Sequence, residues 1–195
     1  MRACAYWTSL LLIGGAPVQA WQAYQSPGFI VQIASPADAR YLPRLFQSLE
    51  RARRELRGWG LRPPDRVRVV VHPTLGSYRK ATAQPWFVLA QADRAQGRID
   101  LQRLSVVVER GGLEAVLRHE YFHLAQPEGW ARWLAEGSAM IFAAQRPSAK
   151  ALEGVSTARL EEILAAPPQP QLLARAMATA YARAQAYWKK RRPAP

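Results

Sequence analysis

The chain has 195 residues, of which 49% are hydrophobic, and its 27 basic and 14 acidic residues give a formal net charge of +13. This length suffices for one domain with a sizeable core, and a single cysteine excludes a disulfide framework within the chain. The charge would suit a nucleic-acid partner. However, 23 of the basic residues are arginines spread along the chain, so we expect solvated surface charge and no nucleic-acid partner.

The first 20 residues have the features of a secretory signal peptide. Arg2 precedes an apolar run, and the small residue Ala20 offers a cleavage site. A membrane anchor is the alternative, but Gly14 and Pro17 break the apolar run short of a membrane-spanning length. Cleavage would also remove Cys4, the one cysteine. We therefore predict an exported protein, periplasmic or secreted, without stable membrane insertion after cleavage.

Beyond this segment, hydrophobic periodicity predicts strands first and helices afterwards. The expected strands cover residues 29–33, 67–71, 84–92 and 99–101. The expected helices cover residues 37–57, 77–83, 113–125, 130–144, 157–165 and 171–190, with a proline-rich break at 166–170. This order predicts an α+β fold, with a small mixed sheet packed against the helix at 113–125 and further helices after it. We expect one domain over residues 21–195, with a C-terminal helical region from about residue 150.

The segment His119-Glu120-Tyr121-Phe122-His123 carries the pattern H-E-x-x-H. Residues four apart on an α-helix lie on one face, so two imidazoles at this spacing can reach one Zn²⁺ at about 2.0–2.1 Å. A glutamate beside the first histidine can then take a proton from a metal-activated water. The pattern therefore predicts a zinc site with Glu120 as general base.

The flanking residues favour a helix that buries this motif. Leu113, Val116 and Leu117 fall at helical period on the same side as His123. Two neutral imidazoles and a carboxylate on an apolar stripe would be unfavourable without a partner. A metal ion would satisfy all three groups.

A third protein ligand should follow the motif. Metzincins use a histidine in H-E-x-x-H-x-x-G-x-x-H, but this chain has Gln126 and Gly129 at the relevant spacing, which excludes that class. A second helix-like segment from residue 130 carries one carboxylate, Glu136. Two histidines and one glutamate, with a water, form an established catalytic zinc set.

Taken together, residues 116–123 and the segment Trp133-Leu134-Ala135-Glu136-Gly137-Ser138-Ala139 resemble the peptidase MA-like family of short gluzincins. The resemblance covers roughly residues 65–145 and, more loosely, the C-terminal helix; the loop between the two motif segments is very short for the family. It implies that His119, His123 and Glu136 bind zinc and that Glu120 is the general base. It also implies that Tyr181, on the last predicted helix, stabilises the oxyanion of the reaction.

The strand at residues 98–101 is expected to lie at the edge of the sheet, lining the cleft. An extended peptide could then pair with Ile99, Asp100 and Leu101 by strand addition, although an ordinary sheet edge would have the same sequence. The predicted function is an exported zinc metallopeptidase that acts on a peptide or protein substrate. Two alternatives are a non-catalytic zinc-binding interaction module of the cell envelope and an amidase acting on a non-protein envelope substrate.

Overall fold

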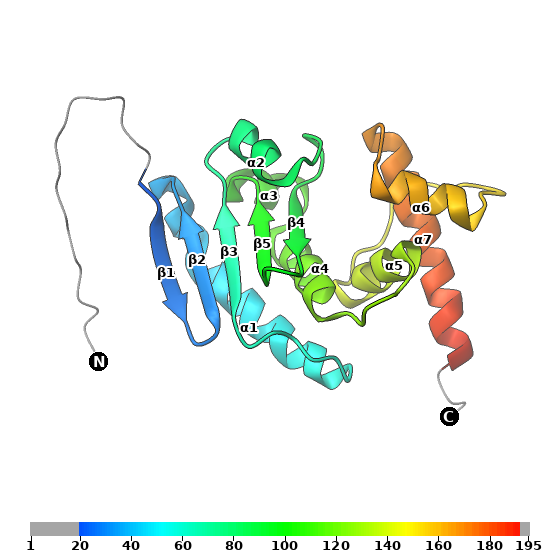
Figure 1. Cartoon of the computed structure of the whole chain (residues 1–195), viewed down its shortest axis with the longest axis horizontal. Coiled ribbons are helices and arrows are strands. Elements are labelled where there is room, and N and C mark those ends of the chain that lie inside the picture. Colours follow the sequence, from blue (N-terminus) through cyan, green and yellow to red (C-terminus); the bar gives the residue numbers. More distant parts are fainter. Residues whose placement is uncertain (1–19, 192–195) are drawn as a thin grey trace.

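The computed structural model describes residues 20–191, which form a five-stranded sheet, seven α-helices and one 3-10 helix (Figure 1). The strands are β1 (Gln22–Ser26), β2 (Phe29–Ile33), β3 (Val67–Val71), β4 (Ala90–Asp93) and β5 (Arg98–Leu101). The helices are η1 (Pro36–Tyr41), α1 (Leu42–Gly58), α2 (Leu75–Thr82), α3 (Leu104–Arg110), α4 (Leu113–Ala125), α5 (Arg132–Phe142), α6 (Thr157–Ala165) and α7 (Pro170–Arg191). The predicted α+β fold is confirmed. The predicted signal peptide lies outside the described residues except for its last residue, Ala20.

The sheet is mixed, with the strand order β1-β2-β3-β5-β4. The antiparallel pairs are β1 with β2 and β4 with β5, whereas β2, β3 and β5 run parallel to one another. The β1–β2 connection is the tight turn at Pro27 and Gly28, where Gly28 has a φ of 87° that a side chain would disfavour. The apolar strand β3 is central.

One face of the sheet is buried under α1 and α4. Alternate residues of β2 and β3 point to this face, as the two-residue period of a strand requires. They join one hydrophobic core with Leu45 and Leu49 of α1 and with Leu117 and Phe122 of α4. This packing fixes α4, and with it the H-E-x-x-H motif, against the sheet.

The helices α5, α6 and α7 lie beyond the β4 side of the sheet (Figure 1). A second hydrophobic cluster joins α6 and α7 through Leu160, Ile163 and Ala176. Helices α5 and α7 approach so closely that a Cβ at Gly137 would lie 2.3 Å from the carbonyl oxygen of Ala180. No helix within residues 20–191 combines the length and apolar character needed to cross a membrane.

Three local predictions were incomplete. The strand β1 was missed because its polar sequence alternates only weakly, and α3 was missed because its short run of β-branched residues gives no clear helical signal. The strand expected at 84–92 is limited to β4. Residues before it turn at Pro85, and the side-chain amide of Gln102 donates to the carbonyl oxygens of Trp86 and Val88 at 2.9 and 2.8 Å.

Candidate metal centre

The H-E-x-x-H motif occupies the second half of α4. Gly112 precedes this helix with a φ of 73°, and the apolar face of α4 packs into the core under the sheet. Helical spacing brings Nε2 of His119 to 3.1 Å from Nε2 of His123. His119 is buried and His123 is half-buried, so both rings are largely removed from water.

Glu136 of α5 faces this pair. Its Oε2 atom lies 3.2 Å from Nε2 of His119 and 3.4 Å from Nε2 of His123. Contacts between α4 and α5 hold the two helices together across the short loop at 126–131. The three side chains predicted to bind zinc therefore converge on one point.

The spacing of these three atoms fits a tetrahedral zinc ion. Ligands bound at about 2.0–2.1 Å lie about 3.3–3.4 Å apart along the edges of a tetrahedron. The observed separations are 3.1, 3.2 and 3.4 Å. Among the described residues, His119, His123 and Glu136 form the one group of this kind suited to a metal ion.

Two glutamines orient the imidazoles. Nδ1 of His119 donates to Oε1 of Gln145 at 2.8 Å, and Nδ1 of His123 donates to Oε1 of Gln126 at 2.9 Å. With the proton on Nδ1, each ring in its neutral form presents the lone pair of Nε2 to the point shared with Glu136. Hydrogen bonds of this kind to the outer nitrogen are typical of metal-bound histidines.

Sequence reasoning missed both glutamines. Gln145 follows the end of α5, where Ala144 adopts a left-handed φ of 54° and the backbone N–H of Gln145 donates to the carbonyl of Met140 at 2.9 Å. This tight helix end turns the chain back so that the amide reaches His119. The pattern of residues gives no signal for such a turn, because alanine rarely adopts a positive φ. Gln126, three residues after His123, could have been noticed from its spacing.

The charges of the cluster favour a cation at its centre. Burial disfavours the charged form of His123, but the carboxylates of Glu136 and Glu120 outweigh burial and raise its pKa to about 9. Burial has the opposite effect on Glu136, yet the two imidazoles hold the pKa of its carboxyl well below the usual range. The cluster thus stabilises positive charge, whether it is carried by a proton or by a metal ion.

Glu120 has a different environment from Glu136. Burial raises the pKa of its carboxyl above the ordinary range, and the charge of Glu136 adds to the rise. The imidazoles and the backbone N–H of Ala92 in β4 act in the opposite direction. The pKa values of the two carboxyl groups are therefore driven apart. Glu136 is held in its charged form, whereas Glu120 takes up a proton more readily than an ordinary carboxylate.

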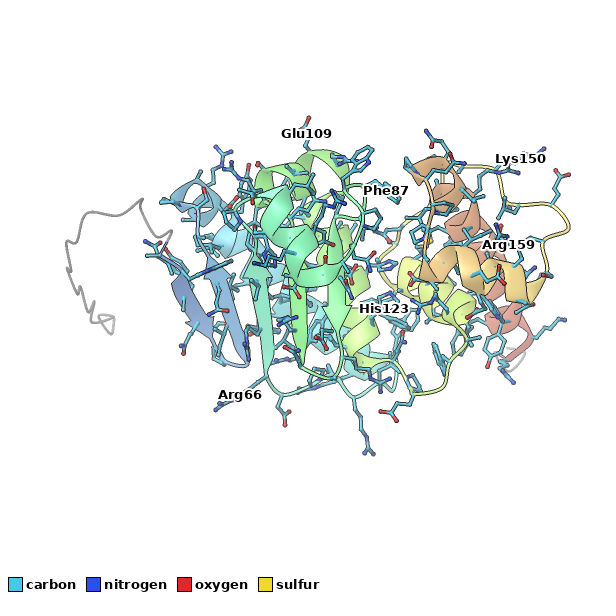
Figure 2. All side chains as sticks on the ribbon, turned by 45° about the horizontal axis from the view of Figure 1, so that its top comes forward. Arg66, Phe87, Glu109, His123, Lys150 and Arg159 are labelled. Carbon is cyan, nitrogen blue, oxygen red and sulfur yellow. The ribbon has the colours of Figure 1, made fainter. Side chains whose placement is uncertain are left out.

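These groups line a cavity of about 510 Å³ between β4 and the helices α5 to α7. Figure 2 shows His123 and Phe87 on the side of the sheet that faces these helices. The cavity also includes side chains from β4, from the loops before and after it, and from α7: Phe87, Gln91, Arg94, Leu173 and Met177. The His119–His123–Glu136 cluster is accordingly open to a bound molecule.

Comparison with protein-family models, with curated proteins and with solved structures found no match. The resemblance to the peptidase MA-like family therefore stays a prediction from the motif residues.

The position expected for Tyr181 is wrong. This residue does not line the cavity, and its hydroxyl accepts a hydrogen bond from the side-chain amide of Gln185 at 3.1 Å on the exposed side of α7. The cavity reaches α7 at Leu173 and Met177. Tyr181 lies one helical turn beyond Met177, about 6 Å farther along the helix.

The edge-strand prediction for Ile99, Asp100 and Leu101 is also wrong. The strand β5 pairs with β3 on one side and β4 on the other, and all three residues are buried. Asp100 accepts hydrogen bonds from Nε2 of His72 and Nε of Arg98, both at 2.8 Å. The edge beside the His119–His123–Glu136 cluster is formed by β4, because β5 pairs with β3 on its other side, and this parallel pairing could not be read from local sequence.

Proposed function

We propose that this protein is an exported zinc-dependent hydrolase that cleaves peptide bonds. The observation that carries the proposal is the triangle formed by Nε2 of His119, Nε2 of His123 and Oε2 of Glu136, with edges of 3.1 to 3.4 Å. Two imidazoles and one carboxylate leave a fourth tetrahedral position free, which distinguishes a catalytic zinc set from a structural one. The cavity provides space for a substrate at that position.

The residues around the cluster supply the proton chemistry. A zinc ion held here would act as a Lewis acid and lower the pKa of a water molecule. Glu120 would accept a proton from that water during its attack on the peptide carbonyl and would then donate the proton to the leaving nitrogen. The raised pKa of Glu120 suits this exchange, because a carboxylate in its ordinary range is a weak base at neutral pH.

The strand β4 is the surface on which an extended substrate would be held. It is the edge strand next to α4, and Gln91 and Ala92 line the cavity. A peptide added to this edge would be held by main-chain hydrogen bonds and would place a carbonyl near His119 and His123. In this proposal β4 takes the role that the sequence had suggested for residues 98–101.

The test is the variant Glu120→Gln. Glutamine keeps the shape of the side chain but cannot accept a proton, so we expect zinc content and thermal stability to be unchanged. Hydrolysis of an unbiased peptide library should fall by about 10²–10⁴-fold. The matched control is Glu114→Gln on the same helix, since the side chain of Glu114 is 44% exposed and contacts Arg51 at 3.4 Å.

Equal hydrolysis by the wild type and by Glu120→Gln would refute the mechanism. If the wild type holds zinc and cleaves no peptide, the peptidase proposal fails. The non-catalytic zinc module or the amidase of a non-protein envelope substrate would then take its place.

A further inference from the structure

The charged residues that line the cavity are unevenly distributed. Apart from the metal cluster and Glu120, the described residues of its wall include two charged side chains, Arg94 and Arg132, and both are basic. The remaining lining is apolar or carries neutral amides. A substrate that fills this cavity therefore contacts positive charge from two arginines that are not part of the His119–His123–Glu136 cluster.

Arg132 is the first residue of α5, one helical turn before Glu136. Residues four apart share a helix face, with Cβ atoms about 5–6 Å apart, so Arg132 lies beside the metal ligand on the cavity side. The carboxylate of Glu161 accepts from the backbone N–H groups of Arg132 and Trp133 at 2.9 and 2.8 Å. Within residues 20–191, the guanidinium of Arg132 has no ion-pair partner.

Arg94 lies at the same end of the cavity. It follows β4 directly, and its guanidinium is 3.7 Å from Oε1 of Glu128, in the loop four residues before Arg132. The side chain of Glu128 is 92% exposed, and such exposed contacts contribute little. A carboxylate from a substrate could displace Glu128 at small cost.

The opposite end of the cavity is apolar. Phe87 and Leu89 precede β4, and Leu173 and Met177 of α7 also line the wall. The four residues of β4 span about 13 Å between this apolar end and Arg94. A peptide lying along β4 would therefore extend from an apolar environment to a basic one.

We propose that the cavity selects peptides that carry a carboxylate, which binds Arg94 and Arg132, and an apolar side chain, which packs beside Phe87. The inference rests on the proposed function and specifies its substrate class. Arginine binds carboxylates through charge-assisted hydrogen bonds that are stronger than neutral ones. The carboxylate is either the C-terminus of the peptide or an acidic side chain.

The experiment measures binding without turnover, on full-length, zinc-loaded Glu120→Gln protein. Three pools of acetylated hexapeptides are compared. Each peptide contains one phenylalanine, and within a pool the phenylalanine occupies each of the positions in turn. The first pool carries glutamine and a C-terminal amide, the second glutamate and a C-terminal amide, and the third glutamine and a free C-terminal carboxylate. Equilibrium dialysis followed by mass spectrometry gives the bound fraction of each peptide.

We expect about tenfold stronger binding in at least one carboxylate pool than in the neutral pool. A preference for the second pool identifies an acidic side chain as the ligand, and a preference for the third identifies the C-terminus. When Arg132→Gln or Arg94→Gln is combined with Glu120→Gln, the preference for the carboxylate pool should fall to about twofold or less. Arg159→Gln is the control, because Arg159 lies on α6 away from His123 (Figure 2) and pairs with Glu162 at 2.8 Å.

Equal binding of the three pools, or no binding of any pool, would overturn the inference. A carboxylate preference that survives in both cavity arginine variants would do the same, since the carboxylate would then bind elsewhere, for example to the zinc. Hydrolysis of the unbiased library by the wild type is measured separately. A protein that hydrolyses peptides without this preference retains the proposed function and loses only its substrate class.

Discussion

At the scale of single residues, the two histidines proposed to bind zinc are oriented by neutral amides. Gln145 and Gln126 fix the tautomers of His119 and His123 without adding negative charge to the cluster. A carboxylate in the same place would make each imidazole more basic. The ligand set therefore contributes one formal negative charge, from Glu136, and would leave a bound Zn²⁺ strongly electrophilic.

Removal of one amide should weaken metal binding. In Gln145→Ala, His119 loses its hydrogen bond at Nδ1, and we expect zinc affinity to fall by about 10–100-fold with little change in fold. A competitive titration against a chromophoric chelator measures this. Gln185→Ala is the control, because Gln185 is exposed on α7 and contacts Tyr181. Identical affinities in the two variants would show that Gln145 has no orienting role.

The pKa of His123 gives zinc binding a pH dependence. Ligand imidazoles must be neutral, and the metal-free protein holds a proton on His123 up to a pKa of about 9. Zinc must displace this proton, so affinity should rise about tenfold per pH unit from pH 7 toward pH 9 and level off above it. An unperturbed histidine, with a pKa of about 6.5, would give no rise in this range. Titrations at pH 7, 8, 9 and 10 separate the two cases.

At the scale of elements, α5 contacts both α4 and α7. One face presents Glu136 to α4, and the adjacent face packs Gly137 against α7, where Trp188 donates from Nε1 to Oγ of Ser138 at 2.9 Å. The placement of Gly137 directly after Glu136 therefore has a physical reason. The glycine allows the close helix contact that holds the neighbouring carboxylate in place.

A side chain at position 137 should disturb both the packing of α5 against α7 and the placement of Glu136. In Gly137→Ala the new Cβ would lie 2.3 Å from the backbone carbonyl of Ala180, so α5 or α7 must shift, at a cost of about 1–3 kcal/mol. Urea unfolding measures the loss, and zinc affinity should fall with it. Gly58→Ala is the control, since a Cβ at Gly58, in α1, meets nothing within 4 Å. Equal stability of the two variants would contradict the packing argument.

The elements also show what local sequence can predict. His119 and His123 could be paired correctly because one helical period fixes their relation, and Glu136 followed because the next helix begins after a short loop. Tyr181 and residues 99–101 could not be placed. How far the cavity extends along α7 depends on the packing of α7 against α5, and the interior position of β5 depends on its parallel pairing with β3, a strand distant in sequence.

At the scale of the whole molecule, the cluster lies where the sheet meets the C-terminal helices. His119 and His123 come from α4, which belongs to the core under the sheet, whereas Glu136 comes from α5, which packs on α7. A metal ion shared by both would tie the two parts together. The cavity beside it is bounded by both parts, so its shape depends on that connection.

The most direct test of this account is the zinc content of the purified protein, measured by elemental analysis. We predict about one zinc per wild-type chain and loss of that zinc in His119→Ala, His123→Ala and Glu136→Ala, with Glu114→Ala retaining it. Circular dichroism verifies that each variant is folded. Equal zinc content in the wild type and in all three ligand variants would contradict the account.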